Sequence, residues 1–300
     1  MRAHGLTHRL LTARPMRLGF HKLERLFPPV VTDLIRYSLS EWNYVPGEWP
    51  AEGLLGEGWD AESVTAAQEA HWPVLVRNLD GTGPLGVSHL PSQMTREHRG
   101  DHNAMMSYGY VLARAARNKD RLSVLDWGGG AGHYCLYSKA LLPEIVVDYH
   151  CYDVPALCRL GRILVPQARF HDKADVFART RFDLVISSSS LHYFQNWRET
   201  AHVLAERSGG FLYVARLQTC NRAPSFVVRQ KPFGQGYATE FLSWFINRRE
   251  LTGYLESLGL ELVREFVFAE EWRVKGAPEN GECRGFLFRR RDVGEEGRSS

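Results

Sequence analysis

The chain has 300 residues, of which 44% are hydrophobic, and this is enough for one large core with an appendage. Its formal net charge of +3 is too small to indicate a nucleic-acid partner. The five cysteines have no Cys-x-x-Cys spacing, so a metal centre is disfavoured and a reducing cytoplasm is expected. No apolar run approaches the roughly 20 residues of a membrane span, so no integral membrane segment is expected.

Residues 1–100 show helical and loop patterns but no alternation of strands with helices. The basic stretch 1–27 favours a terminal helix and lacks the apolar region of a secretory signal. Residues 42–60 are rich in Trp, Gly and Pro, which indicates a loop anchored by aromatic side chains. Asp60 is positioned to cap the helix that follows. We therefore predict a cap of helices and loops that covers the ligand-binding edge of the next domain.

A glycine-rich turn follows the first strong strand signal. The turn reads Asp-Trp-Gly-Gly-Gly-Ala-Gly-His over Asp126–His133, directly after the β-forming residues Val124 and Leu125. A helix capped by Asp101 is expected before this strand, and residues 134–142 favour a helix after the turn. Glycines let a ligand approach the backbone, and a helix start offers unpaired N–H groups. These three elements together predict a ligand-binding site.

The spacing of the glycines narrows the choice of ligand. A dinucleotide fingerprint reads Gly-x-Gly-x-x-Gly, but His133 stands where the third glycine would be. The run instead reads Asp-x-Gly-x-Gly-x-Gly, formed by Asp126, Gly128, Gly130 and Gly132. A nicotinamide-dependent oxidoreductase is therefore the less favoured alternative.

After the turn, strands and helices alternate, which predicts a parallel sheet. Asp153 follows a strand over 146–152 and lies about 20 residues beyond the turn, where a Rossmann-like unit places its ribose-binding acid. Capping a helix is the alternative role for this side chain. A short third strand over 168–171 is followed by Asp172 and Asp175.

Phe182–Ser187 reads as a buried fourth strand, and more serines follow it at the carboxyl edge of the sheet. Ligands bind at that edge, so Ser187 is a candidate cofactor contact. Residues 219–239 have no clear period and are expected to form a loop that faces the substrate. The other expected elements are a helix over 197–205, a strand over 211–217, a helix over 243–258, a closing hairpin over 260–268 and 285–289, and a disordered tail over 292–300.

The block 122–197 resembles class I S-adenosylmethionine-dependent methyltransferases through three motifs, Leu-Asp-Trp-Gly-Gly-Gly-Ala-Gly, Tyr-Asp-Val-Pro and Phe-Asp-Leu-Val-Ile-Ser-Ser-Ser-Ser-Leu-His-Tyr. The resemblance implies an α/β fold with a doubly wound, mostly parallel seven-stranded sheet whose last strand is antiparallel. It places the methyltransferase domain at 101–291, behind an N-terminal cap over 1–100. The first and third motifs are also similar to bacterial methyltransferases associated with polysaccharide or specialised-metabolite pathways.

The resemblance implies that S-adenosylmethionine is the cofactor, and it assigns parts of the cofactor to residues of this sequence. Asp153 would bind the ribose, and Asp172 would face the adenine edge, with Asp175 as the alternative. The methionine end is assigned to four residues, Asp126, Gly128, Gly130 and Gly132.

The implied reaction is methyl transfer to an oxygen of a small molecule or glycan precursor. A non-catalytic, cofactor-binding regulatory partner is a further alternative. An acceptor hydroxyl needs a proton acceptor near neutral pH, and histidine has a suitable pKa. His192 follows the fourth strand at the ligand edge and His102 begins the helix before the first strand, so both are candidates. His133 is expected to pack within the turn, and catalysis by positioning alone is the other possibility.

Overall fold

The computed structural model describes Pro28, Val31, Tyr37 and residues 40–50, 56–86 and 99–291. The helix expected over 1–27 and the tail expected over 292–300 lie outside the described residues. The α-helices are α4 (Glu62–Asp80), α5 (Arg99–Ala115), α6 (His133–Leu141), α7 (Pro155–Leu164), α8 (Trp197–Arg207) and α9 (Arg248–Ser257). The 3-10 helices are η2 (Gly58–Asp60), η3 (Ala174–Phe177), η4 (Leu191–Tyr193) and η5 (Pro232–Gln235). The strands are β1 (Trp42–Val45), β2 (Arg121–Trp127), β3 (Val146–Tyr152), β4 (Arg169–His171), β5 (Phe182–Ser188), β6 (Ser208–Cys220), β7 (Phe226–Gln230), β8 (Phe241–Asn247), β9 (Leu260–Trp272) and β10 (Gly281–Arg290).

The main part of the sheet has the strand order β4-β3-β2-β5-β6-β10-β9. Strands β2 to β6 pair in parallel along this path, and β10 runs antiparallel to both β6 and β9. The predicted α/β, mostly parallel, seven-stranded arrangement is therefore confirmed, including its antiparallel strand. The closing hairpin is longer than expected, because β9 extends to Trp272 and β10 already begins at Gly281.

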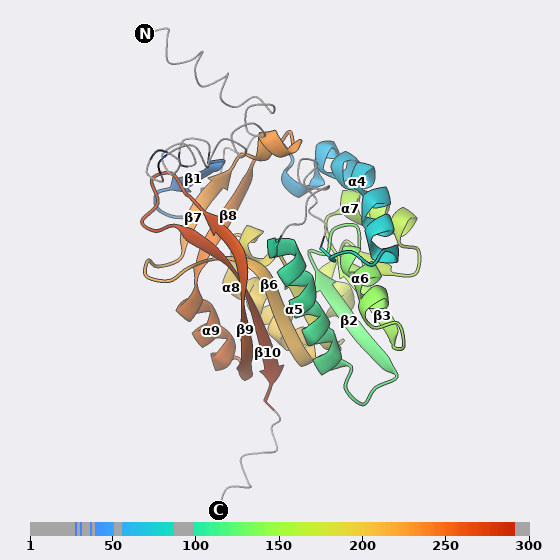
Figure 1. Ribbon diagram of the computed structural model, residues 1–300. Helices are drawn as coiled ribbons and strands as arrows, with labels where there is room; N and C mark the ends of the chain where they lie inside the picture. Colours follow the sequence, from blue (N-terminus) through green and yellow to red (C-terminus); the bar gives the residue numbers. More distant parts are fainter. Residues whose placement is uncertain are drawn as a thin grey trace, which may run out of the picture.

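Both faces of this sheet are buried, because successive side chains of a strand point to opposite faces. Val124 and Leu184 pack in one cluster with side chains from α4 to α7. Leu125 and Val185, their neighbours in sequence, pack in a second cluster with α8 and α9. Figure 1 shows α5 crossing one face of the sheet. Covering helices on both faces leave the strand ends as the place where a ligand can reach the backbone.

Three strands extend the sheet beyond β6 in the order β8-β7-β1, and we call them the insertion sheet. They pair antiparallel with one another, and β8 joins the end of β6 in parallel. Three predictions are wrong here. Residues 42–60 contain β1 rather than only a loop, residues 219–239 contain β7 and η5, and the helix expected over 243–258 begins as β8.

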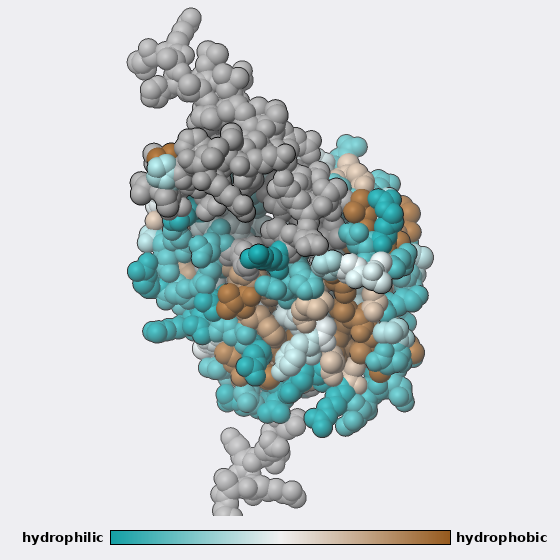
Figure 2. Space-filling view, in the orientation of Figure 1, coloured by the Kyte–Doolittle hydropathy of each residue, from teal (hydrophilic) through white to brown (hydrophobic). Residues whose placement is uncertain are grey.

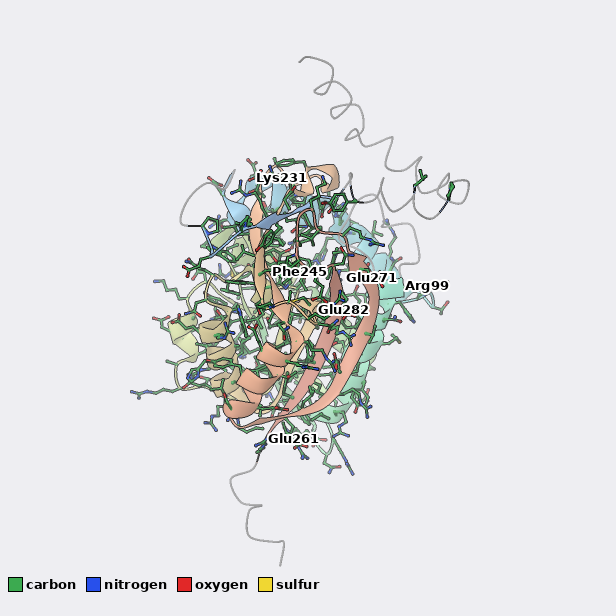
Figure 3. The ribbon with its side chains drawn as sticks, turned by 90° about the vertical axis from the view of Figure 1, so that its left-hand side faces the viewer. Arg99, Lys231, Phe245, Glu261, Glu271 and Glu282 are labelled. Carbon is green, nitrogen blue, oxygen red and sulfur yellow. The ribbon has the colours of Figure 1, made fainter. Side chains whose placement is uncertain are left out.

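Pairing partners explain these errors. The run Phe241–Asn247 is rich in aromatic and aliphatic residues, and such a short apolar run is compatible with a strand or a helix. Pairing with β7 selects the strand. Inside the insertion sheet, Phe226 stacks on Phe245 with ring centroids 5.4 Å apart, and Trp42 meets Phe245 edge-on at 5.8 Å. Figure 3 shows Phe245 between Lys231, at one end of this unit, and Glu282 of β10.

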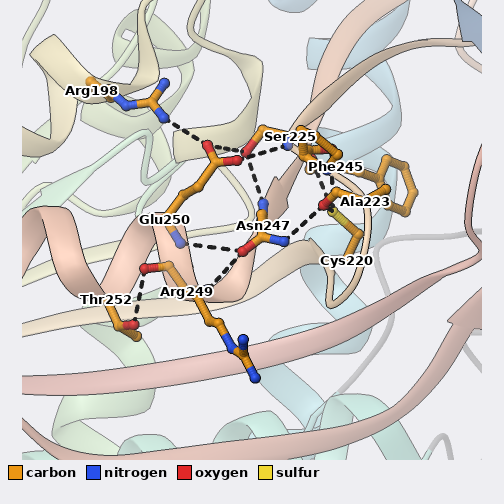
Figure 4. A network of polar contacts seen from close by, with 10 residues as sticks. Arg198, Cys220, Ala223, Ser225, Phe245, Asn247, Arg249, Glu250 and Thr252 are labelled. Atoms are coloured by element: carbon orange, nitrogen blue, oxygen red, sulfur yellow. Dashed lines mark hydrogen bonds and ion pairs between the residues drawn. The ribbon is translucent and has the colours of Figure 1, made fainter.

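A polar network fixes the base of the insertion sheet to the core (Figure 4). Asn247 ends β8, and its Oδ1 accepts hydrogen bonds from the backbone N–H groups of Arg249 and Glu250 in the first turn of α9. Its Nδ2 donates to the Ala223 carbonyl at 2.7 Å. The carboxylate of Glu250 accepts from the backbone N–H and the hydroxyl of Ser225, and from Arg198 of α8 at 2.6 Å. The insertion sheet is thus joined to both helices on that face of the main sheet.

The described surface is mostly hydrophilic in the view of Figure 2, with apolar residues gathered along the middle of that face. Three exposed apolar side chains in this part of the fold are Met106 and Tyr110 of α5 and Val267 of β9. Within the described residues, every helix is too short or too polar to cross a lipid bilayer.

Candidate functional site

A cavity of about 500 Å³ lies at the carboxyl ends of β2, β3, β5 and β6. The turn between β2 and α6 forms one side of it, and the segment around η2 and the start of α4 forms another. This is the edge at which open α/β sheets bind ligands. The described part of the N-terminal hundred residues contributes Glu57, Trp59, Asp60, Gln68 and Gly86 to its lining.

The glycine turn has a backbone that other residues would not readily adopt. Gly128 has φ +74°, and a Cβ atom there would lie 2.3 Å from the Ser190 Cβ. Gly132 has φ +89°, and a Cβ atom there would lie 2.8 Å from the ring of Phe170. Gly130 also has a positive φ, and it lines the cavity with Gly128 and Gly129. The turn therefore presents bare backbone to the cavity, as the sequence predicts.

Asp126 is the next-to-last residue of β2, is fully buried and lines the cavity. Burial raises the pKa of its carboxyl to about 7, the hydrogen bond from the Tyr149 hydroxyl opposes this shift, and the charge of Asp153 adds to it. Its Oδ1 has no hydrogen-bond partner among the described residues. An unpaired buried carboxylate oxygen is costly unless a ligand satisfies it. Asp126 thus fits a cationic group bound in the cavity.

Asp153 follows β3 and joins the turn to α7. Its Oδ2 accepts the Gly130 N–H and its Oδ1 accepts the Val154 N–H, both at 2.7 Å. Burial raises the pKa of Asp153 to about 6, although both backbone hydrogen bonds lower it. The side chain lines the cavity, and its oxygens retain lone pairs for hydroxyl donors. Asp153 is not the N-cap residue of α7, which is Val154, so its structural role is to hold the glycine turn, and this role is compatible with ligand binding.

Of the other predicted cofactor contacts, some line the cavity and others do not. Asp172 lines the cavity, whereas Asp175 is absent from its lining. Ser187 is fully buried, its Oγ lies 2.7 Å from the Ser190 Oγ, and it does not reach the cavity. The next three residues, Ser188 to Ser190, line the cavity instead.

The segment around η2 is bound to the glycine turn and to α7 by side chains. Asp60 does not cap α4, whose N-cap residue is Ala61; its Oδ1 accepts the Ala156 N–H at 2.9 Å, in the first turn of α7. The Oε1 of Gln68 accepts the Ala131 N–H at 3.2 Å. The expected cap on α4 is therefore wrong, and the same carboxylate satisfies a helix start that is distant in sequence.

Aromatic rings from three chain segments form a second wall of the cavity, which we call the aromatic wall (Trp59, Tyr193 and Tyr237). The ring centroid of Trp59 lies 4.9 Å from that of Tyr193 and 6.4 Å from that of Tyr237. Phe241 stacks behind Trp59 at 4.4 Å. Tyr237 belongs to the segment expected to face the substrate, and it does line the cavity. This wall offers flat apolar surface to a second ligand.

An ion pair in the cavity was missed by sequence reasoning. Arg216 of β6 lies 2.7 Å from Asp101, measured between Nη1 and Oδ1, and both line the cavity. Asp101 is the third residue of α5 and is buried, so it does not serve as the expected cap before that helix. The sequence feature that could have indicated this pair is the single charge of Arg216 inside the apolar run Val214-Ala215-Arg216-Leu217.

Neither histidine proposed as a base lines the cavity. His192 is fully buried; burial, with a smaller effect of the Arg216 charge, lowers its pKa to about 3, which makes it a poor base at neutral pH. The Nδ1 of His102 lies 3.1 Å from the Leu85 carbonyl oxygen. His133 lines the cavity and packs against the ring of Trp72, in line with its expected place in the turn.

Among solved structures, magnesium protoporphyrin IX methyltransferase from Synechocystis PCC 6803 is similar at 12% identity, over 77% of this chain and 98% of that chain, with a TM-score of 0.44. The 1,6-didemethyltoxoflavin-N1-methyltransferase of Burkholderia thailandensis is similar at 14% identity, over 83% of this chain and 95% of that chain, with a TM-score of 0.44. A search of curated proteins finds no significant match.

A family model described as a methyltransferase domain matches residues 101–265, which is more than half of the chain. The matched region begins in α5 and ends within β9, and it contains the glycine turn and strands β2 to β8. The buried, unpaired Asp126 oxygen beside bare backbone fits a cofactor with a cationic amino-acid end. The chain belongs to this methyltransferase-domain family and is an S-adenosylmethionine-dependent methyltransferase.

Proposed function

We propose that this enzyme transfers the methyl group to an oxygen of a small-molecule acceptor that binds against the aromatic wall. The observation that carries this proposal is the shared cavity, in which the glycine turn and the aromatic wall face one space of about 500 Å³. Such a volume lies within the usual range for small-molecule sites. This volume favours a small molecule over a long glycan, and the same test includes an acceptor that is the end of a glycan precursor.

We assign the cofactor contacts as follows. Asp126 binds the ammonium group through its unpaired Oδ1, and the backbone of Gly128 to Gly130, which lines the cavity, surrounds the methionine end. Gly132, also predicted as a contact, is absent from the lining and instead packs against Phe170. Asp153 accepts the ribose hydroxyls, and Asp172 faces the adenine edge. Ser188 to Ser190 take the place proposed for Ser187, because they line the cavity. When bound, S-adenosylmethionine supplies a methyl group activated by a sulfonium.

Positioning carries most of the catalysis in this proposal. The aromatic wall holds the acceptor plane, and the surrounding side chains exclude water from the reacting atoms. His192 and His102 both lie outside the cavity lining, so neither is retained as the base. We propose that the acceptor reaches the cavity with a hydroxyl that ionises easily, rather than one that needs a strong base.

The division of the chain is also part of the proposal. Residues 1–100 act as a cap that includes β1 and α4, and residues 101–291 form the methyltransferase domain. The narrower similarity to methyltransferases of polysaccharide or specialised-metabolite pathways stays a prediction about the acceptor. The five cysteines are buried and form no disulfide, which supports a reducing cytoplasm as the location.

Two measurements test this function. Calorimetry with S-adenosylmethionine, S-adenosylhomocysteine and NAD should give binding of the first two and none of NAD. A mass-spectrometric screen with methyl-labelled cofactor should then place the label on an oxygen of a small molecule. Label found on nitrogen, sulfur or carbon would refute the oxygen assignment, and transfer only to polymeric glycans would refute the small-molecule assignment.

A further inference from the structure

Arg216 occupies a distorted point of β6. The pairing of β6 with β10 shifts register there, since Arg284 lies opposite Leu217 but Phe286 lies opposite Val214. One extra residue of β6 is therefore accommodated as a bulge at Ala215–Arg216. Arg216 has φ +48°, a left-handed conformation that is uncommon for residues other than glycine. Bulges of this kind can re-aim a side chain, and strained residues cluster at functional sites.

Asp101 holds the re-aimed side chain inside the cavity. Its carboxylate is 2% exposed and forms the ion pair with the Arg216 guanidinium, whose side chain is 22% exposed. The pair joins the start of α5 to the end of the parallel part of β6. A purely structural ion pair would not need the guanidinium to line the cavity, yet both partners do.

The charge of Arg216 stands out from its surroundings. Within the described residues, it is the one lysine or arginine in the cavity lining. Its positive charge opposes the rise that burial causes in the pKa of Tyr134 and of Tyr193, so it acts on the turn side and on the aromatic wall. A guanidinium has five N–H donors in a planar fork and can bind two oxyanions at once.

We propose that Arg216 is a specificity-determining residue that binds a carboxylate or ionised hydroxyl of a planar acceptor lying on the aromatic wall. The inference rests on the proposed function and names its substrate class, namely aromatic or enolic hydroxy acids. Asp101 is the positioning residue that holds the guanidinium, and the exposed part of the Arg216 side chain that lines the cavity contacts the ligand. The same positive charge favours the ionised form of a nearby acceptor hydroxyl, and neither His192 nor His102, the two histidines considered as bases, lines the cavity.

The test uses the full chain saturated with S-adenosylhomocysteine and a panel of matched ligands. Hydroxybenzoates and hydroxycinnamates form the acidic members, and their carboxamides are the neutral counterparts of the same shape. Calorimetry should show the best acid binding at least about tenfold more tightly than its amide, as for a charged hydrogen bond. Arg216→Met should abolish that difference, and Arg216→Lys should retain part of it.

Two controls separate recognition from folding. Arg121→Met removes an arginine outside the cavity lining and should leave the preference for acids unchanged. S-adenosylhomocysteine affinity, measured for every variant, reports whether the site is intact. Asp101→Asn should weaken acid binding and raise the acceptor KM more than it lowers kcat, because it disturbs position and not the reacting atoms. A drop in kcat alone would contradict its positioning role.

The inference is overturned if acids and amides bind alike, if no acid in the panel binds, or if Arg216→Met keeps the preference. Failure of the proposed function gives a different result. Labelled transfer to the oxygen of a neutral acceptor, independent of Arg216, would leave the proposed function standing and reject only the anion site. Transfer to nitrogen of an acidic acceptor, dependent on Arg216, would reject only the oxygen assignment.

Discussion

The two ends of the cavity are built in different ways. At the cofactor end, each contributing residue lies at or just beyond the carboxyl end of a strand. Asp126, Asp153, Asp172 and Ser188 to Ser190 therefore meet, because parallel strands end together. At the acceptor end, the side chains come from segments that no regular strand order would bring together. Loop and insertion contacts assemble Trp59 and Tyr237, and a bulge directs Arg216.

This difference indicates which part of the cavity can change its side chains without changing the fold. The cofactor end depends on backbone conformation, since side chains at Gly128 or Gly132 would clash with neighbours. The acceptor end depends on side chains, held by contacts such as the Gly58 N–H donating to the Thr239 hydroxyl at 3.0 Å. We therefore expect substitutions at the two ends to separate cofactor affinity from acceptor affinity.

The largest expected effect is at the cofactor end. Asp126→Asn removes the charge that we assign to the ammonium group, so cofactor affinity should fall about 10- to 150-fold, the range of a charged hydrogen bond. Calorimetry with S-adenosylhomocysteine measures it. Asp175→Asn, outside the cavity lining, is the matched control and should bind like the parent. Equal affinity of Asp126→Asn and parent would contradict the assignment.

The acceptor end should respond to loss of its central ring. Trp59→Ala removes the ring that touches Tyr193, Tyr237 and Phe241, and the acceptor KM should rise about tenfold while cofactor affinity changes by less than about twofold. Steady-state kinetics with an acceptor found in the screen measures the first value. Trp49→Ala is the control, because Trp49 packs on Trp244 away from the cavity lining. Equal losses in both affinities would show that the two ends are not separable.

Lowering the pH should weaken cofactor binding, whereas it should increase the contribution of two buried carboxyl groups to the stability of the fold. Burial raises the pKa of Asp126 to about 7 and of Asp153 to about 6, from an ordinary value of 3.8. Folded protein then binds these protons more tightly, so their stabilising contribution is full below pH ~4 and is lost as the pH rises through 6 and 7. Cofactor binding needs ionised Asp126, so affinity should rise by about one order of magnitude between pH ~5.5 and ~7.5.

Asp126→Asn sharpens that prediction, because it removes the group with the higher pKa. Calorimetric titrations and thermal melts across this pH range should both flatten in the variant. An unchanged pH profile of cofactor affinity in Asp126→Asn would assign the titration to another group.

The smallest effect concerns the link between the two ends. Asp60→Ala removes the acceptor for the Ala156 N–H at the start of α7, which should lower stability by about 0.5–2 kcal/mol. Differential scanning calorimetry should show a Tm lower by a few degrees, whereas Asp80→Ala at the exposed end of α4 should melt with the parent. A Tm equal to that of the parent would mean that solvent satisfies this N–H group without help from η2.

Local patterns sufficed to place Asp126, Asp153 and Asp172 at one cavity and to predict the main sheet. Glycine spacing, strand alternation and the acids after each strand are short-range features, and the topology of a parallel sheet turns them into one site. Ser187 shows the limit of this reasoning, because the alternation of β5 buries it and exposes Ser188 to the cavity. His192 fails for a similar reason, since the short helix η4 carries it into the core.

The sequence alone determined the α/β class, the alternation of strands and helices, the glycine turn and the positions of the acids beside it, because backbone conformation and side-chain period are local properties. Only the tertiary structure decided the insertion sheet, the capping of α7 by Asp60 and the pairing of Asp101 with Arg216. Each of these depends on a partner tens of residues away. A short apolar run, a lone carboxylate or a single arginine has several possible partners, and packing of the whole chain selects among them.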